Sequence, residues 1–321
     1  MAKKLLGCAL VGGAVVLVLV VVFALVVGSI VGGVTLGPKI ANIDLEGIIT
    51  SNRTGGLFET GASMVDRIKE DLSRAVEDES VKAIVLRINS PGGEVTASDT
   101  IHRAVSEARE AKPVVVYMDA MAASGGYYVA CAADEIYANE TTLTGSIGVI
   151  IQTLSYYDLF GKIGLGAVVF TSGEFKDSLG GARELRPEER DYIQSLVDQM
   201  YEKFLGIVAQ GREIEEKDLR RGIADGRVFT GAQALEENLV DANGYVEDAY
   251  ARARELADAP DAKVVRYRRE TGLLAILGSA RARLAGVGSK IPGRLEIDIA
   301  ERILPRLEPG MIYLLPSHYA P

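Results

Sequence analysis

The stretch that decides the fold is Met121-Ala122-Ala123-Ser124-Gly125-Gly126-Tyr127-Tyr128. It lies between a β-branched run, residues 114–119, and an apolar helical pattern, residues 127–133, so the sequence predicts a strand-to-helix turn at Ser124. Helix N-termini carry unpaired N–H groups and a partial positive charge, so a hydroxyl there can attack a carbonyl while amides receive the oxyanion. A plain helix cap, with glycines that permit close packing, is the alternative interpretation.

Composition excludes several classes of function. The chain has 321 residues, 48% apolar and 25% charged, as in a globular protein with a sizeable core. Its net charge of −9 argues against a nucleic-acid partner, because phosphate binding needs clustered Lys and Arg. Only Cys8 and Cys131 are present, so we expect neither a disulfide framework nor a thiolate metal site. We expect no cofactor and no metal.

An apolar segment without charges, residues 5–36, begins near the N-terminus and exceeds the roughly 20 residues that cross a bilayer. A cleaved signal peptide is the competing interpretation, but its apolar region normally has about 7–15 residues. Lys3 and Lys4 precede the segment, so the positive-inside rule predicts a cytoplasmic N-terminus. We therefore expect a single-pass anchor in the lipid bilayer of the cell membrane, with the rest of the chain outside the cytoplasm.

Strand and helix patterns alternate after this segment. Strands are predicted at residues 40–49, 81–88, 113–119, 135–138 and 167–171, and helices at residues 63–76, 187–211 and 246–257 and directly after the turn at residues 89–94. This recurrence at βαβ spacing predicts an α/β fold with a mostly parallel sheet covered by helices.

A serine hydroxyl needs a base that removes its proton. Histidine is nearly absent: His102 lies on a predicted helix, His318 lies in the weakly patterned tail, and neither belongs to a motif that supports a Ser-His-Asp triad. Lysine is the remaining common base, provided that burial lowers its pKa. Lys176 follows a predicted strand and a glycine, although Glu174 and Asp177 could equally keep it as an ordinary surface lysine.

The tripeptide Pro91-Gly92-Gly93, which follows a predicted strand, favours an oxyanion hole at this turn. Glycines let the backbone approach a substrate and present N–H groups with no side chain in the way. One donor from this turn and one from Gly125 would suffice for an oxyanion. The alternative interpretation is a tight turn before a helix.

Five segments occur together and in order: residues 89–93 (Asn-Ser-Pro-Gly-Gly), 121–127, 143–149, 172–177 and 226–231. The set resembles the short, single-repeat form of bacterial and archaeal signal peptide peptidase A, a relative of the Clp-protease and crotonase fold. The resemblance covers roughly residues 39–257 and includes the N-terminal anchor. It implies an anchor at residues 1–38, a Clp-protease/crotonase-like peptidase domain at residues 39–258 and an extension of unknown role at residues 259–321.

The resemblance also implies residue roles. Ser124 falls on the nucleophile and Lys176 on the general base of a Ser/Lys dyad. Ser146, in a stretch that lines the site in the family, could orient the lysine amine. The family's oxyanion donors fall on three glycines, Gly92, Gly93 and Gly125. In similar proteins the serine and the lysine come from neighbouring protomers, so the resemblance implies a homo-oligomer with sites between protomers.

The implied substrates are apolar peptides, above all released signal peptides, which are hydrolysed through an acyl-enzyme. Other interpretations are a membrane protease that pairs with stomatin-like proteins, a crotonase-like acyl-CoA enzyme and an inactive scaffold that binds apolar peptides. The apolar residues 311–316 could lie in a peptide-binding groove as a self-inhibitory segment; the alternatives are a poorly ordered terminus and packing on a neighbouring subunit.

Overall fold

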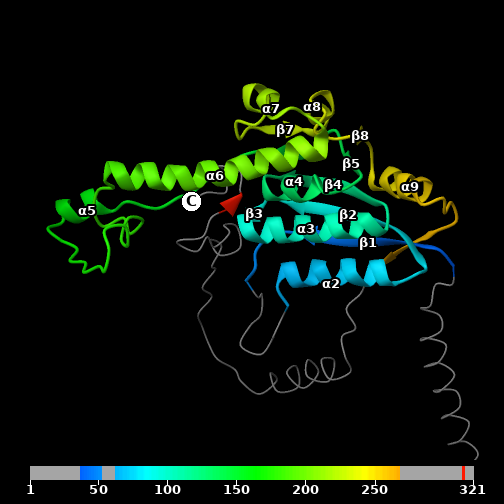
Figure 1. The fold of residues 1–321 in the computed structure, drawn as a ribbon, viewed down its shortest axis with the longest axis horizontal. Coiled ribbons are helices and arrows are strands. Elements are labelled where there is room, and N and C mark those ends of the chain that lie inside the picture. Colours follow the sequence, from blue (N-terminus) through cyan, green and yellow to red (C-terminus); the bar gives the residue numbers. More distant parts are fainter. Residues whose placement is uncertain (1–36, 53–61, 268–312, 315–321) are drawn as a thin grey trace, which may run out of the picture. The chain divides into compact units, whose positions relative to one another are not determined.

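The computed structural model describes residues 37–52, 62–267 and 313–314 (Figure 1). From Lys39 onward these residues belong to one compact unit. Within the described residues, no helix has both the length and the apolar composition that a bilayer span requires. The expected anchor, residues 5–36, lies outside the described residues and stays a prediction.

A mostly parallel sheet forms the centre of this unit, as the βαβ pattern predicts. Its strands follow the order β7-β6-β4-β2-β1-β9, with β5 on β4 and β8 on β5, and the β6–β7 pair is antiparallel. The strands are β1 (Lys39–Glu46), β2 (Val81–Ser90), β4 (Val114–Ala123), β5 (Glu135–Ala138), β6 (Leu143–Gly145), β7 (Val228–Thr230), β8 (Ala242–Asn243) and β9 (Lys263–Arg266). A separate pair joins β3 (Gly93–Glu94) to β10 (Tyr313–Leu314).

Helices cover both faces of the sheet, which explains why β2 and β4 are nearly continuous apolar runs. Alternate residues of β2 divide between two cores: Ile84 and Leu86 pack with the helices that follow β1, β2 and β4, whereas Ala83 and Val85 pack with α9. The helices are α2 (Met64–Glu77), α3 (Val95–Ala111), α4 (Gly125–Ala130), α5 (Tyr157–Lys162), α6 (Pro187–Arg212), α7 (Glu216–Gly222), α8 (Gly231–Glu236) and α9 (Val246–Leu256).

The longest of these helices, α6, has 26 residues and therefore extends about 39 Å. Its C-terminal half packs on the core, where Phe204 and Val208 are buried. Its N-terminal half is more exposed, and more than half of the Tyr192 side chain is accessible to solvent. The segment that precedes α6, residues 151–186, is here called the arm; α5 within it lies at the N-terminal end of α6, away from the sheet (Figure 1).

The predicted strands and long helices are confirmed, with one exception. Residues 167–171 form no strand, and 94% of the Phe170 side chain is exposed. A β-branched run forms a strand only where a neighbouring strand accepts its hydrogen bonds, and the arm offers none here. In addition, β9 continues the sheet beyond residue 258 by pairing with β1, a pairing that the weak pattern of this region did not indicate.

Candidate active site

Ser124 lies where the sequence predicts it, between the end of β4 and the start of α4. Its backbone has φ 51° and ψ −115°, a conformation that residues other than glycine rarely adopt and that is typical of sharp nucleophile turns. Two backbone hydrogen bonds hold it: the Ser124 N–H donates to the Gly145 carbonyl, and the Tyr128 N–H donates to the Ser124 carbonyl, both at 2.8 Å. The side chain is fully buried, and its hydroxyl has no hydrogen-bond partner among the described residues.

Gly93 and Gly125 lie next to each other at the turn that holds Ser124. A Cβ atom built on Gly125 would lie 3.2 Å from the Gly93 nitrogen and 3.2 Å from the Gly92 Cα. The Gly92 N–H already donates to the Ser90 hydroxyl at 3.1 Å. Of the predicted oxyanion donors, Gly93 and Gly125 therefore fit the role best, since the first amides of α4 have no acceptor within the helix.

The segment after β1 holds the glycine turn in place. The Ile49 N–H donates to the Gly92 carbonyl and the Glu94 N–H donates to the Ile49 carbonyl, each at 2.8 Å. The buried Glu94 carboxylate accepts a hydrogen bond from the Ser51 N–H at 3.0 Å and another from the Thr50 hydroxyl. A side chain at Gly93 would overlap the Ile49 carbonyl, so this position requires glycine.

Strand β10 occupies the free edge of this turn. Leu314 pairs with Gly93 and Tyr313 with Glu94 in an antiparallel arrangement. An extended peptide that adds a strand to an exposed edge binds in the same way. The self-inhibitory position that the sequence suggests for residues 311–316 therefore agrees with the pairing of the two residues that the structure describes there.

His102 does not act on Ser124 in this structure. Its ring contacts the Tyr128 ring edge-on, with centroids 5.3 Å apart, and the Tyr128 hydroxyl donates to Asp99 at 2.7 Å. Lys203 on α6 forms an ion pair with the same Asp99 carboxylate at 2.7 Å. The pKa of His102 is lowered to about 4, chiefly by burial and to a smaller extent by Lys203, against the opposing effect of Asp99. The imidazole is thus neutral near pH 7, and it is a packing residue under the turn.

Ser146 is also buried and has a positive φ of 51°, with its N–H donating to the Arg227 carbonyl at 2.8 Å. It lies at one side of a cleft of about 490 Å³. The cleft is lined further by residues 147–150, by Gln194, Val197, Asp198 and Tyr201 of α6, and by residues 224–226. Ser146 directly follows β6, which pairs with the last residues of β4, so the structure places it at the end of the strand next to the Ser124 turn.

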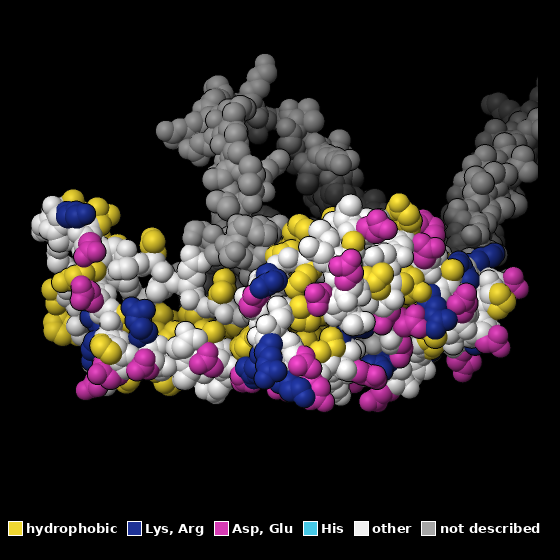
Figure 2. All heavy atoms as spheres, turned by 90° about the horizontal axis from the view of Figure 1, so that it is seen from above, with side chains coloured by type: hydrophobic (Ala, Val, Ile, Leu, Met, Phe, Trp, Pro, Cys, Tyr) yellow, Lys and Arg dark blue, Asp and Glu magenta, His cyan; other side chains and the backbone are white. Residues whose placement is uncertain are grey.

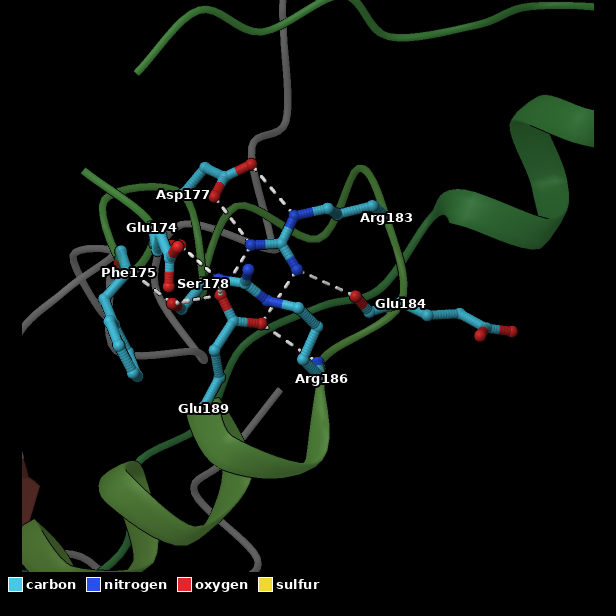
Figure 3. A network of polar contacts seen from close by, with 8 residues as sticks. All are labelled: Glu174, Phe175, Asp177, Ser178, Arg183, Glu184, Arg186 and Glu189. Atoms are coloured by element: carbon cyan, nitrogen blue, oxygen red, sulfur yellow. Dashed lines mark hydrogen bonds and ion pairs between the residues drawn. The ribbon is translucent and has the colours of Figure 1, made fainter. Parts of the chain in front are cut away.

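Lys176 lies on the arm, in an exposed turn. Polar side chains next to it in sequence bind to the start of α6 (Figure 3). We call Asp177, Ser178, Arg183, Arg186 and Glu189 the clamp. Arg183 donates to Asp177 at 2.6 and 3.0 Å and to Glu189 at 2.6 and 2.8 Å. Glu189 also accepts from the Ser178 hydroxyl at 2.8 Å and from the Arg186 guanidinium at 2.6 Å.

The Glu189 carboxylate is fully buried within the clamp, and the hydrogen bonds from Arg183 and Arg186 hold its pKa far below the usual range. The sequence does not indicate that Glu189 is the centre of the clamp, because a glutamate in the first turn after Pro187 is typical of an ordinary helix start. Through Asp177 and Ser178 the clamp fixes the two residues that directly follow Lys176.

The structure does not bring Lys176 to Ser124 within one chain. Next to Lys176, the Phe175 ring contacts Tyr192 of α6, with centroids 5.5 Å apart. Next to Ser124, Tyr128 contacts Phe204 of α6, with centroids 5.1 Å apart. Tyr192 and Phe204 are separated by twelve helical residues, about 18 Å. The Ser124 hydroxyl accordingly makes no hydrogen bond to Lys176 within the described residues.

Comparison with known proteins identifies the family. The family model described as Peptidase family S49 matches residues 106–260. A candidate signal peptide peptidase SppA of Enterococcus faecium is 35% identical over 73% of this chain and 68% of its own length. A candidate protease of Methanocaldococcus jannaschii is 35% identical over 81% of this chain and 87% of its own. The chain belongs to peptidase family S49.

This S49 chain is a serine peptidase, which confirms the family resemblance read from the five segments. A further relative, the chloroplastic serine protease SPPA of Arabidopsis thaliana, is 35% identical over 79% of this chain but 38% of its own length. Ser124 and the 143–149 stretch lie within the residues that the family model matches, and so does Lys176. Gly92 and Gly93 precede that match.

The pKa of His102 predicts an acid-dependent loss of stability. The imidazole binds a proton below about pH 6.5 in the unfolded chain but only below about pH 4 in the folded chain. The free energy of unfolding therefore falls as the pH drops from 6.5 to 4, by at most about 3 kcal/mol. Urea unfolding at pH 7.5, 6 and 5 measures this fall. We expect it to shrink in His102→Phe, and an unchanged pH dependence in that variant would contradict the assignment.

The β10 pairing predicts autoinhibition of the S49 peptidase. Deleting residues 310–321 should lower KM for peptides severalfold, because a substrate no longer competes with the tail for the edge of β3. A synthetic peptide of residues 310–321 should then inhibit the shortened enzyme competitively. Equal KM values for the two proteins, with no inhibition by the peptide, would show that β10 does not block the site.

The clamp predicts that Glu189 supports activity from a distance. Glu189→Gln leaves two guanidinium groups without their buried carboxylate, so the turn around Lys176 should loosen and kcat should fall by about tenfold or more. Hydrogen exchange in residues 173–183 should quicken at the same time. Glu188→Gln, a change at the neighbouring exposed position, is the matched control. If Glu189→Gln exchanges and turns over like this control, the clamp does not position the lysine.

Proposed function

We propose that this S49 peptidase is a membrane-anchored endopeptidase with a Ser/Lys dyad, in which Ser124 of one protomer meets Lys176 of another. The observation that carries the proposal is the buried Ser124 hydroxyl. The residue has a strained backbone, directly precedes Gly125, which lies next to Gly93, and has no base as a hydrogen-bond partner among the residues described. A nucleophile with no base beside it in the described part of the chain supports a base that comes from another protomer.

The proposed reaction is acyl transfer. The neutral Lys176 amine takes the proton of the Ser124 hydroxyl, and the oxygen attacks the substrate carbonyl, whose electron pair moves onto its oxygen. The amides of Gly93 and Gly125 stabilise this oxyanion. The lysine ammonium then gives its proton to the leaving amine as the C–N bond breaks, and water hydrolyses the ester by the same route. Ser146, beside the Ser124 turn, is suited to orient the lysine amine.

The surface of the arm supports the proposed assembly. Seven large apolar side chains on it are at least half exposed: Leu154, Leu159, Ile163, Leu165, Val168, Val169 and Phe170. Figure 2 shows hydrophobic side chains on the surface at this end of the molecule. An apolar surface of this kind is typical of a protein interface. A second copy that covers the arm would also remove water from its lysine, and loss of water favours the neutral amine of a base.

The proposed substrates are apolar peptides, released signal peptides above all. The pairing of β10 with β3 supports an extended binding mode, because main-chain hydrogen bonds hold a strand of almost any sequence. The name of the Enterococcus faecium relative points to the same class of peptide. An anchor at residues 5–36 would raise the effective concentration of enzyme beside membrane-embedded substrates.

The parallel sheet with its glycine turn also fits a Clp-protease/crotonase-like domain.

Mixing two inactive variants tests the dyad between protomers. Ser124→Ala and Lys176→Ala should each abolish hydrolysis of a synthetic signal peptide by the full-length protein in detergent. Co-expression of the two should restore roughly a quarter of wild-type activity, because random assembly pairs an intact serine with an intact lysine at about one site in four.

Lys162→Ala, which removes another exposed lysine of the arm, is the control and should keep full activity. Wild-type activity of Lys176→Ala would exclude this lysine as the base. Co-assembly of the two inactive variants without any return of activity would exclude the arrangement between protomers. A serine-directed fluorophosphonate that fails to label Ser124 would favour a crotonase-like acyl-CoA enzyme instead.

A further inference from the structure

Ser98 on α3 has a fully buried hydroxyl without a hydrogen-bond partner among the described residues. Other hydroxyls on the same helix bond back to the preceding turn: Thr100 donates to the Thr96 carbonyl at 2.7 Å and Ser106 to the His102 carbonyl at 3.1 Å. A buried hydroxyl without a partner lowers stability, and most native proteins provide one. The structure of the free chain thus offers no reason for a serine rather than an alanine at position 98.

The position of this hydroxyl supplies a reason. A Cβ built on Gly125 would overlap the Ser98 Oγ and would lie 3.2 Å from the Gly93 nitrogen. The hydroxyl therefore borders the same small space as the two amides that fit an oxyanion hole. Ser124, whose hydroxyl also has no partner among the described residues, directly precedes Gly125. The Ser98 hydroxyl thus lies against the glycine pair next to the nucleophile, close to where a substrate carbonyl would react.

We propose that the Ser98 hydroxyl is a third donor to the oxyanion of the tetrahedral intermediate, an inference that rests on the proposed function of Ser124. When the Ser124 oxygen bonds to the carbonyl carbon, the carbonyl electron pair moves onto its oxygen, and Ser98 donates a hydrogen bond to it without transferring its proton. When the intermediate collapses, the electron pair returns, the C–N bond breaks and the Ser98 hydrogen bond is released. The hydroxyl is satisfied only while the negative charge exists, as transition-state stabilisation requires.

Ser98→Ala tests this role in the full-length protein. We expect kcat for a synthetic signal peptide to fall by about 10- to 100-fold, somewhat less than the loss of a single donor in a two-donor hole, with KM unchanged. Thermal stability should stay equal or rise, because the variant removes an unsatisfied buried hydroxyl. Ser106→Ala on the same helix is the matched control and should keep the wild-type kcat. Ser98→Cys, with its weak S–H donor, should lie between alanine and wild type.

A mimic of the intermediate separates this role from packing. A peptidyl trifluoromethyl ketone forms a tetrahedral adduct with a serine, so its affinity should fall in Ser98→Ala by the same factor as kcat/KM. Wild-type kcat in Ser98→Ala would overturn the inference. So would a reduced kcat that comes with lower thermal stability and an unchanged affinity for the ketone. Activity retained in Ser124→Ala would instead overturn the proposed function itself, which keeps the two failures distinguishable.

Discussion

The candidate active site depends on the strained turn at Ser124, whose φ is positive, between β4 and α4. Such a conformation costs about 1–3 kcal/mol and persists only where the surroundings enforce it. Here β6 enforces it, because it pairs with the last residues of β4 and accepts the Ser124 N–H at Gly145. The residue that follows, Gly125, lies against the glycine turn that follows β2. Sheet pairing, strain and the reactive hydroxyl are therefore parts of one arrangement.

A second constraint comes from the length of α6. The helix packs on the core at one end and contacts Phe175, the neighbour of Lys176, at the other, with about 18 Å between the two contact points. The clamp around Glu189 makes the distant end rigid, because buried charge pairs of this kind have few alternative arrangements. A lysine held so far from the serine of its own chain can still serve the serine of a neighbour. The exposed apolar surface of the arm is consistent with such a neighbour.

Much of this fold could be predicted from local pattern. The β-branched runs predict β2 and β4, the small residues around Ser124 predict a strand-to-helix turn, and the pattern of residues 187–211 predicts a helix; the structure confirms these elements. Residues 167–171 show the limit, because a β-branched run looks the same whether it joins a sheet or lies exposed. Only partners distant in sequence decide between these outcomes.

The site was less accessible to sequence reasoning. Ser98 looks like any small residue of a helix, and Glu189 looks like a helix start, because their roles arise from residues that only the fold brings near them. Gly92 and Gly93 read as equivalent donors, until the Ser90 hydroxyl is seen to occupy the amide of Gly92. The position of Lys176 relative to Ser124 depends on how parts distant in sequence are arranged, which no local pattern specifies.

An experimental structure of the assembled full-length protein in detergent, with a peptide analogue bound, measures the decisive quantity. That quantity is the distance from the Ser124 Oγ to the nearest Lys176 Nζ. We expect hydrogen-bond distance, about 3 Å, between atoms of two different protomers. A structure in which every Lys176 lies far from every Ser124, with the arm packed against its own chain or exposed to solvent, would contradict the account.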